Sequence, residues 1–420
     1  MTSLFCFFLV PVGNALNFFK FNDFAVISPQ NLRFIKRKFV YLQKKVFMYI
    51  HQNSNWPNFT WDIAIVTPLL VEVNRKAGFL SGMLSSIGFE ERQMASVETI
   101  THDIVSSSEI EGVMLNTEQV RSSVARRMGI ELKNEVQSSR YIDGVVEMMI
   151  DAITKCNQPL THERLFAWHN CLFPTGYSGM QKINVAKYRV DSMEVVSGMM
   201  GREKVHYKAP EPEFISNEMN CFLDWFNARV QNDYIKSAIA HFWFVTIHPF
   251  DDGNGRISRA IADMALSQVD DSQLRYFSMS KQISKEKKKY YQILEKCQKG
   301  DCDITLWIKW YLECMSRAID ESKTLLSSIF NKAVFWQINA QTIFTDRQKT
   351  VLNVYLDGYI GKLTVKNWAK HAKVSPDTAA RDIKDLVEKK ILVAQPGKVR
   401  DTSYGIRIVD NSIIVPGTQI

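Results

Sequence analysis

Apolar residues recur at helical spacing over most of the chain, and the clearest case covers residues 234–247. The apolar positions of that segment are Ile235, Ala238, Ile239, Phe242 and Val245. The same period resumes after Arg256, on Ile257, Ala260, Ile261 and Met264. Residues 251–255, between the two segments, contain two glycines and an asparagine, which favour a tight turn with positive φ. We therefore expect a buried helix, a glycine turn and a second helix.

Helical spacing and capping residues predict further helices, so the expected fold class is mainly α. The predicted helices cover residues 67–85, 89–108, 132–155, 161–173, 216–229, 284–299 and 305–325. Two short stretches, 187–190 and 205–208, flank a glycine-containing turn at 198–201 and predict a β-hairpin. This hairpin would add a small β element to a helical core.

The C-terminal segment, residues 341–410, is predicted to form three helices followed by two strands. Thr345 and Gln348 make a capping box at the start of the first helix, and Ser375 caps the last one. The two strands are expected at residues 391–393 and 404–406. The pattern resembles a winged helix-turn-helix domain.

The candidate recognition helix of this winged helix carries Arg381 and Lys384, whose charges suit phosphate contacts. Three aspartates of the same helix, Asp377, Asp382 and Asp385, dilute the positive face. Winged helices bind DNA or protein, so both kinds of partner stay open for this segment.

The composition is that of an ordinary soluble globular protein, with 420 residues, 46% hydrophobic and 23% charged. This length allows two or three domains. Seven scattered cysteines without a CxxC pair do not indicate a disulfide framework or a zinc site, and a reducing, cytoplasmic compartment fits. The net charge of +8 is concentrated at the ends. Residues 1–47 contain seven Lys or Arg and one Asp, and residues 341–410 contain thirteen Lys or Arg and eight Asp or Glu.

Residues 1–47 form an atypical leader. The apolar stretch at residues 4–12 is far shorter than the about 20 residues that a membrane helix needs, so we expect no membrane partner. The leader also lacks the positive region that begins a signal peptide. We interpret it as disordered, or as translated from upstream of a true start at Met48. The next segment, residues 48–130, is predicted to be an N-terminal helical domain.

The densest chemistry lies at residues 248–259, HPFDDGNGRISR. Pro249 biases His248 away from α geometry, so His248 is expected at the end of the preceding helix. A glycine turn at a helix N-terminus directs backbone NH groups and the positive end of the helix dipole into one concavity, which is an anion-binding nest. Arg256 and Arg259 lie one turn apart and can bind phosphate oxygens. This combination predicts a polyphosphate ligand.

Two side chains beside the nest suit the chemistry of phosphates. Asp252 offers a hard oxygen ligand of the kind that Mg²⁺ prefers. His248 can accept a proton from an incoming hydroxyl, because the ordinary pKa of histidine lies near neutrality. A base, a metal ligand and a phosphate cradle together indicate transfer from a nucleotide.

Residues 248–259 resemble the signature of the Fic family, HPFx(D/E)GNGRxxR, and match it at every specified position. The resemblance implies a Fic-type helical core over residues 131–330, with a β-hairpin flap. It also implies an enzyme that uses ATP and Mg²⁺ to move AMP onto a Ser, Thr or Tyr hydroxyl of a target protein. On this resemblance His248 is the general base and Asp252 the Mg²⁺ ligand. The phosphate-binding residues would be Gly253, Asn254, Gly255, Arg256 and Arg259.

Two further parts of the site follow from the same resemblance. Val195 and Val196 would belong to the flap, which in Fic proteins pairs with the backbone of the target. Tyr290 and Tyr291 fall where family members line the adenine pocket. Two tyrosines on a helix also serve as core residues, so both roles stay open.

Residues 107–112, SSEIEG, match an inhibitory motif that many Fic proteins carry, (S/T)xxxE(G/N). Ser107 and Glu111 share a helix face, and Gly112 permits a helix stop. The resemblance implies that Glu111 pairs with Arg259 and occupies the position of the γ-phosphate.

The sequence thus favours a protein adenylyltransferase restrained by Glu111. One rival is a DNA-binding regulator whose Fic core senses nucleotide, although sensing would not need a base at His248. In another interpretation Glu111 orients a water molecule, so that the same site removes AMP from a modified protein. The target, its modified hydroxyl and the formation of a homodimer stay open.

Overall fold

The computed structural model describes residues 10–12, 15–17, 49–85, 87–132, 134–197, 204–229, 233–357, 359, 361–395, 402–409 and 412–414. The chain divides into two compact units, Met1–Met48 and Tyr49–Ile420. In the first unit, β1 (Val10–Val12) and β2 (Ala15–Asn17) pair in antiparallel fashion. The rest of the expected leader, the candidate start Met48 and the expected turn at 198–201 lie outside the described residues.

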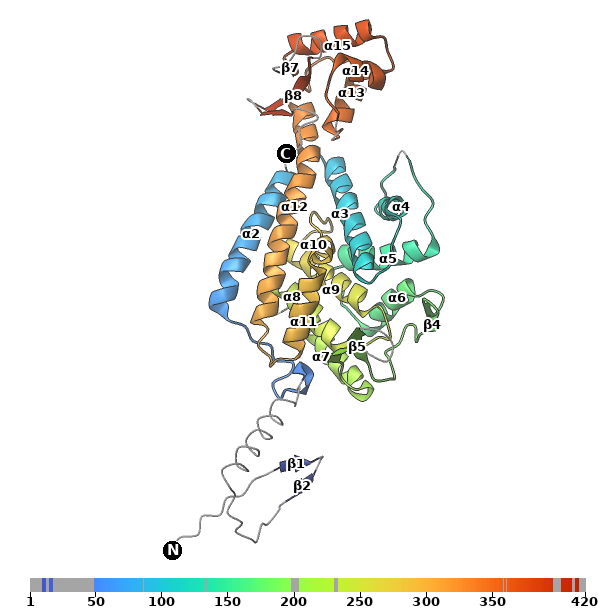
Figure 1. Cartoon of the computed structure of the whole chain (residues 1–420), viewed down its shortest axis with the longest axis vertical. Coiled ribbons are helices and arrows are strands. Elements are labelled where there is room, and N and C mark those ends of the chain that lie inside the picture. The colour runs from blue at the N-terminus through green and yellow to red at the C-terminus, as the bar shows by residue number, and fades with distance from the viewer. Residues whose placement is uncertain are drawn as a thin grey trace, which may run out of the picture. The chain divides into compact units, whose positions relative to one another are not determined.

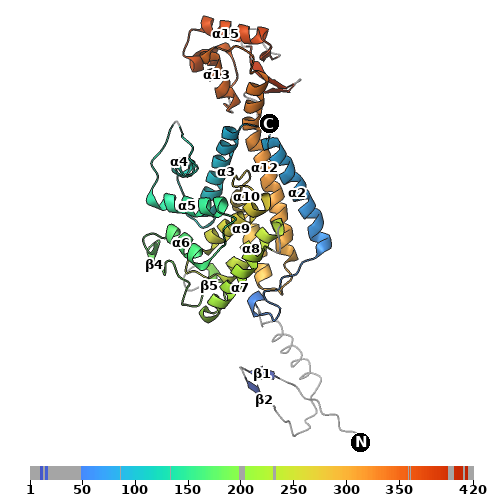
Figure 2. The same ribbon diagram turned by 180° about the vertical axis from the view of Figure 1, so that it is seen from behind.

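The second unit is mainly helical, as the sequence predicts (Figure 1; Figure 2). Its N-terminal part contains η1 (Ile50–Gln52), α2 (Ile63–Ser85), α3 (Phe89–Ile110), α4 (Thr117–Arg127), α5 (Arg140–Thr154) and α6 (His162–Leu172). Its central part contains η2 (Pro212–Phe214), α7 (Ile215–Ala228), α8 (Tyr234–Ile247), α9 (Asn254–Asp270), α10 (Met279–Lys285), α11 (Lys287–Gln298) and α12 (Thr305–Ile338). In the described ranges, no helix is long and apolar enough to cross a membrane.

Helix α8 forms the centre of this unit, and all 14 of its residues are buried. It packs along α9, and α12 runs beside both α8 and α2. The indole N–H of Trp307, on α12, donates to the carbonyl oxygen of Ala238 at 2.8 Å. The hydroxyls of Tyr311 and Ser237 share a buried hydrogen bond of 2.6 Å between the same two helices. Helix α8, whose C-terminal end carries His248, is therefore held in place by packing and by hydrogen bonds from α12.

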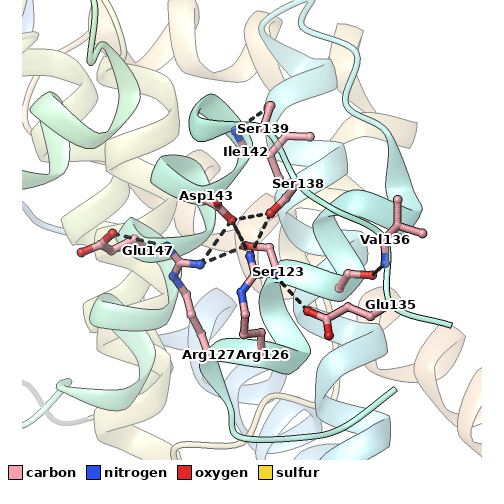
Figure 3. Close-up of polar contacts among 11 residues, drawn as sticks. Ser123, Arg126, Arg127, Glu135, Val136, Ser138, Ser139, Ile142, Asp143 and Glu147 are labelled. Carbon is pink, nitrogen blue, oxygen red and sulfur yellow. Dashed lines mark hydrogen bonds and ion pairs between the residues drawn. The ribbon is translucent and has the colours of Figure 1, made fainter. Parts of the chain in front are cut away.

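A polar cluster joins α4 to α5 (Figure 3). The carboxylate of Asp143 accepts hydrogen bonds from the hydroxyls of Ser123 and Ser138, at 2.5 and 2.6 Å. Asp143 also pairs with Arg126 at 3.0 Å and with Arg127 at 3.4 Å. Because these groups are partly exposed, we expect them to orient the two helices more than to stabilise the fold.

One predicted helix begins later than its apolar pattern indicates. The helix expected over 132–155 is α5, which starts only at Arg140. The side chain of Ser139 caps it by accepting from the backbone N–H of Ile142 at 3.3 Å. A capping serine fixes a helix start more strongly than a preceding apolar residue does.

The helix expected over 284–299 is two helices, α10 and α11. They meet at Glu286, whose φ of −107° and ψ of 19° are not helical. Its carboxylate is held by the guanidinium of Arg317, at 2.7 and 2.8 Å. Helix α12 in turn runs past the predicted end at residue 325 to Ile338, because its last turns pack into a second core that includes Phe335.

The predicted hairpin exists, but its first strand was placed wrongly. The hairpin pairs β5 (Glu194–Ser197) with β6 (Lys204–Lys208), with a register shift between Val195 and Val196. Residues 187–190 instead run along the 248–259 loop, where the backbone N–H of Arg189 donates to the carbonyl of Pro249 at 2.9 Å. All residues of β5 are exposed. Its sequence therefore lacks the alternation of buried apolar and exposed polar residues that would have identified it as a strand. A smaller pair joins β3 (Tyr177–Ser178) to β4 (Gln181–Lys182).

The C-terminal part has its own core around Trp368 and Leu386. Its elements are α13 (Asp346–Leu356), α14 (Val365–Ala372), α15 (Pro376–Glu388), β7 (Leu392–Ala394), β8 (Tyr404–Val409) and β9 (Ser412–Ile414). The capping box of Thr345 and Gln348 is present at the start of α13. The sheet has three strands in the order β7-β8-β9, whereas two were expected, because β9 pairs with the far edge of β8.

Candidate active site

The loop between α8 and α9 is closed by its own side chains. His248 ends α8 in the left-handed region, with a φ of 52°, and Gly253 precedes α9 with a φ of 84°. The side chain of Asn254 accepts from the backbone N–H of Phe250 at 2.9 Å and donates to its carbonyl at 2.7 Å. Asn254 is 2% exposed, so this amide is a fixed part of the loop. Of the turn expected at residues 251–255, only Gly253 has a positive φ, because α9 already begins at Asn254.

Arg189 holds the backbone of His248 in this position. Its Nε donates to the carbonyl oxygen of His248 at 2.8 Å, and its Nη1 donates to the carbonyl of Asp191 at 2.7 Å. The side chain is 3% exposed. A left-handed backbone is costly for a residue with a Cβ, so a buried clamp of this kind is needed. Sequence reasoning missed Arg189, because nothing in its local pattern distinguishes it from a strand residue.

His169 is a second positioning residue that the sequence did not reveal. Its ring stacks on Phe250 with centroids 4.3 Å apart. One ring nitrogen lies 3.1 Å from the carbonyl of Asp252, and the other accepts from the backbone N–H of Ala186 at 3.1 Å. Burial lowers the pKa of His169 to about 4, so the ring is neutral and donates through a single N–H.

His248 has the tautomer that a general base requires. Its Nδ1 lies 3.1 Å from the carbonyl oxygen of Val245, which can only accept, so Nδ1 carries the proton. Nε2 is then free to take a proton from another group. Burial lowers the pKa of His248, and the guanidinium of Arg189 acts in the same direction. The imidazole is therefore neutral near pH 7.

Glu111 lies at the N-terminus of α9, against Arg259, the second arginine of the motif. Its Oε1 is 2.8 Å from Nη2 of Arg259, whose side chain is 2% exposed. Arg259 also donates to the hydroxyl and the carbonyl oxygen of Ser107, each at 2.8 Å. A Cβ built on Gly255 would meet Oε1 of Glu111 at 2.1 Å, so the carboxylate touches the glycine backbone. Gly112 follows with a φ of 79° and turns the chain away after α3.

This corner has the chemistry of an anion site. A helix N-terminus and an arginine converge on one point, and a carboxylate occupies it. Among the described residues, Nη1 of Arg259 and Nε of Arg256 are buried without a hydrogen-bond partner. Buried donors without partners are rare, and Nη1 of Arg259 lies beside the backbone of Gly255, where a larger anion such as a phosphate chain could satisfy it.

Arg256 faces a different environment from Arg259. Its Nη1 donates to the hydroxyl of Tyr141 at 2.9 Å, and its guanidinium lies 5.0 Å from the ring centroid of Phe173. Asp252 is 3.7 Å from its Nη2. The structure thus brings Arg256 close to Asp252, while Arg259 faces Glu111.

The chemistry of Asp252 fits a magnesium ion. Its side chain is 44% exposed, and it accepts hydrogen bonds from the hydroxyl of Ser178 and from the backbone N–H of Gly253. Within the described ranges no group of three or more His, Cys, Asp or Glu could enclose a metal. Mg²⁺ is commonly held by one or two carboxylates together with substrate phosphates, and a single exposed aspartate beside the nest suits that mode.

A cavity of about 700 Å³ opens beside His248, Gly255 and Glu111. This volume lies within the range that ligand sites occupy. Val195 and Val196 of β5 line it, and both are partly exposed. Tyr290 and Tyr291 both line the same cavity. Tyr291 is 40% exposed, whereas Tyr290 is 2% exposed and its hydroxyl lies 3.0 Å from Nε2 of His241.

The comparisons with known proteins cover most of the region described above. Residues 159–266 match the Fic/DOC family, and residues 49–130 match a domain of unknown function (DUF4172). A protein named protein adenylyltransferase Fic, from Aedes aegypti, is 27% identical over 241 residues, which are 54% of this chain and 42% of that protein. A protein named uridine 5'-monophosphate transferase, from Xanthomonas campestris, is 29% identical over 118 residues, which are 26% of this chain and 21% of that protein.

The chain therefore spans less than half the length of the curated relatives just named. A solved structure of a Fic family protein from Desulfovibrio desulfuricans G20 is 19% identical, with a TM-score of 0.49. It covers 83% of this chain and 97% of its own. The match to the Fic/DOC family thus covers residues 159–266, which include the complete 248–259 motif.

Proposed function

We propose that this chain is a protein adenylyltransferase, which moves AMP from ATP to a Ser, Thr or Tyr hydroxyl of another protein, and that Glu111 restrains it. The observation that carries this proposal is that a neutral His248, Gly255 and Glu111 all line one cavity. The family match and the name of the Aedes relative support the same chemistry.

In the proposed reaction, Nε2 of His248 accepts the proton of the target hydroxyl as that oxygen attacks the α-phosphorus of ATP. The bond to the oxygen that bridges the α- and β-phosphates breaks, and pyrophosphate leaves. The N-terminus of α9 and the side chain of Arg259 stabilise negative charge on the phosphates. A Mg²⁺ ion held by Asp252 would neutralise part of that charge.

Glu111 opposes this reaction in two ways. Its carboxylate pairs with Arg259 at 2.8 Å, so the arginine is not available to a phosphate. It also lies against Gly255, at the point where α9 presents its positive dipole end. A phosphate oxygen in the same place would meet both the volume and the charge of the carboxylate. ATP therefore binds productively only when the end of α3 moves.

The flap supports a protein as the acceptor. In the described part of the chain β5 pairs only with β6, so the other edge of β5 is open. An extended segment of a target can add to such an edge through main-chain hydrogen bonds. Val195 and Val196, 36% and 47% exposed, would then contact the side chain to be modified.

The direct test uses ATP labelled at the α-phosphate, with Mg²⁺ and a cell lysate. The wild type, Glu111→Gly and His248→Ala are compared. We expect protein labelling that rises in Glu111→Gly and disappears in His248→Ala. No α-label in any variant would overturn the proposal.

A second donor is suggested by one relative, the protein named uridine 5'-monophosphate transferase. The same experiment with α-labelled UTP separates the two donors, since only the correct nucleotide will label proteins in the Glu111→Gly variant. Removal of AMP by a water that Glu111 orients is tested with a pre-labelled target, whose loss of label would then require Glu111.

A regulatory role of the C-terminal part belongs to the same proposal. Arg381 and Lys384 are exposed on α15, whereas Asp382 is buried and pairs with Arg347 at 2.7 Å. Because Asp382 is buried and paired, it lowers the positive charge on the exposed face of α15 less than the sequence indicates. Retention of DNA by residues 334–420, with steep loss of binding as salt rises, would support a DNA partner. Retention that is insensitive to salt or absent would favour a protein partner.

A further inference from the structure

Three side chains at the rim of the same cavity form a second proton-accepting chain. The hydroxyl of Ser197, at the end of β5, lies 2.5 Å from Nε2 of His206 on β6. Nδ1 of His206 lies 2.7 Å from Oε2 of Glu295 on α11. The three residues come from three elements, and all of them line the cavity that contains His248.

The order of donors and acceptors in this chain follows from its chemistry. A carboxylate can only accept, so Nδ1 of a neutral His206 carries the ring proton and donates it to Glu295. Nε2 is then unprotonated and accepts from the hydroxyl of Ser197. The other oxygen of Glu295 accepts from Nζ of Lys299 at 2.6 Å, which holds the carboxylate in place.

A hydroxyl, an imidazole and a carboxylate in this order are the arrangement that activates a serine as a nucleophile. Ser197 is exposed, and the side chains of His206 and Glu295 are 25% and 26% exposed, so the chain meets the cavity and is not part of the core.

We propose that Ser197 is a self-modification site, which accepts the nucleotidyl group inside its own cavity with His206 as its base. This inference rests on the proposed function, which supplies ATP to the cavity. Oγ of Ser197 attacks the α-phosphorus, and its proton passes to Nε2 of His206. The bond from the α-phosphorus to the bridging oxygen breaks, and pyrophosphate leaves with the electron pair. Glu295 stabilises the imidazolium that forms.

The product would occupy the flap and the cavity at once. AMP on Ser197 removes the hydroxyl that His206 binds and fills space beside Val196, where a target would lie. Self-modification therefore competes with modification of another protein, and a target that covers β5 should suppress it.

The test uses the full chain as Glu111→Gly, with α-labelled ATP and Mg²⁺, and locates the adenylyl group by peptide mass spectrometry. A lysate arm run in parallel reports transfer to other proteins. Ser197→Ala should remove the adduct, and Ser197→Thr should restore one at the same position. His206→Gln should slow its formation roughly 100-fold or more, as loss of a general base does.

Because His206 and His248 are different bases, self-modification and transfer to other proteins can be tested separately. In the Glu111→Gly/His248→Ala variant, labelling of lysate proteins should disappear while the Ser197 adduct still forms. Labelled lysate proteins without any adduct on Ser197 would overturn the inference and leave the proposed function standing. An adduct that survives His206→Gln unchanged would overturn the role of His206. Absence of label in both arms would overturn both proposals.

Discussion

At the scale of single residues, the protonation state of His248 would set the pH range of the proposed reaction. The hydrogen bond from Nδ1 to Val245 leaves Nε2 as the accepting atom, and burial lowers the pKa of the ring. A base works only when it is neutral. A lowered pKa therefore extends activity toward acidic pH.

We predict that kcat/KM of the Glu111→Gly variant is flat from pH 8 to about 6.5, the ordinary pKa of histidine, and falls only below it. His248→Ala should lose at least about 100-fold in rate while keeping its unfolding midpoint. The measurement is the labelling rate across a pH series. An acid limb centred above the ordinary histidine pKa would contradict the lowered pKa.

The effect of the Glu111 carboxylate on ATP binding can be measured apart from the role of His248. It is 30% exposed on its side chain and pairs with the buried Arg259. We predict that Glu111→Gln tightens ATP binding by roughly 5–150-fold, a change of the size that coupling between two binding sites typically produces. The matched control is Glu109→Gln, two residues earlier, whose carboxylate is exposed and accepts a hydrogen bond from the hydroxyl of Ser284 at 3.4 Å. Calorimetric titration with ATP measures both, and equal affinities in the two variants would refute the competition.

At the scale of elements, helix α3 is held by side-chain contacts at other positions besides Glu111. Asp103, one turn before Ser107, is 5% exposed. Its carboxylate accepts hydrogen bonds from the hydroxyl of Ser278 and from the N–H and hydroxyl of Ser280, at the start of α10. Release of Glu111 therefore requires movement of the end of α3, while Asp103 holds the middle.

We predict that Asp103→Ala lowers the free energy of unfolding by about 2 kcal/mol, because it leaves buried donors of Ser278 and Ser280 without an acceptor. The same change should raise self-labelling, since the end of α3 is held less firmly. Glu109→Ala, on the exposed side of α3, should stay within about 0.5 kcal/mol of the wild type. Urea unfolding and the labelling assay report the two effects, and a destabilised variant with unchanged labelling would show that Asp103 serves stability alone.

At the scale of the whole molecule, two cores lie along one helix. The first gathers the apolar residues of α2 to α11 and the start of α12, and the second surrounds Phe335 near the end of α12. In the second core, Trp368 is fully buried and donates its indole N–H to Asp382 at 3.1 Å. Because this core is separate from the first, we expect the C-terminal part to behave as an independent domain.

We predict that residues 334–420, which retain Phe335, unfold in one cooperative transition when produced alone. A Phe335→Ala version should lose about 3 to 5 kcal/mol, because it removes a fully buried ring from a small core. Thermal unfolding followed by circular dichroism measures both fragments. A broad, non-cooperative transition of the unsubstituted fragment would mean that the C-terminal part depends on the rest of the chain.

The sequence by itself determined the features that depend on residue type and short spacing. The helical class, the capping box at Thr345, the turn after His248 and the chemistry of residues 248–259 all follow from local sterics and periodicity. Local rules do not specify which distant surfaces meet. Only the tertiary structure decided that Arg189 clamps His248 and that Ser197, His206 and Glu295 align. The pairing of Glu111 with Arg259 was implied by the family resemblance, and the structure gives it a distance of 2.8 Å. Each of these contacts joins elements far apart in the chain, so its partner is set by packing and not by spacing.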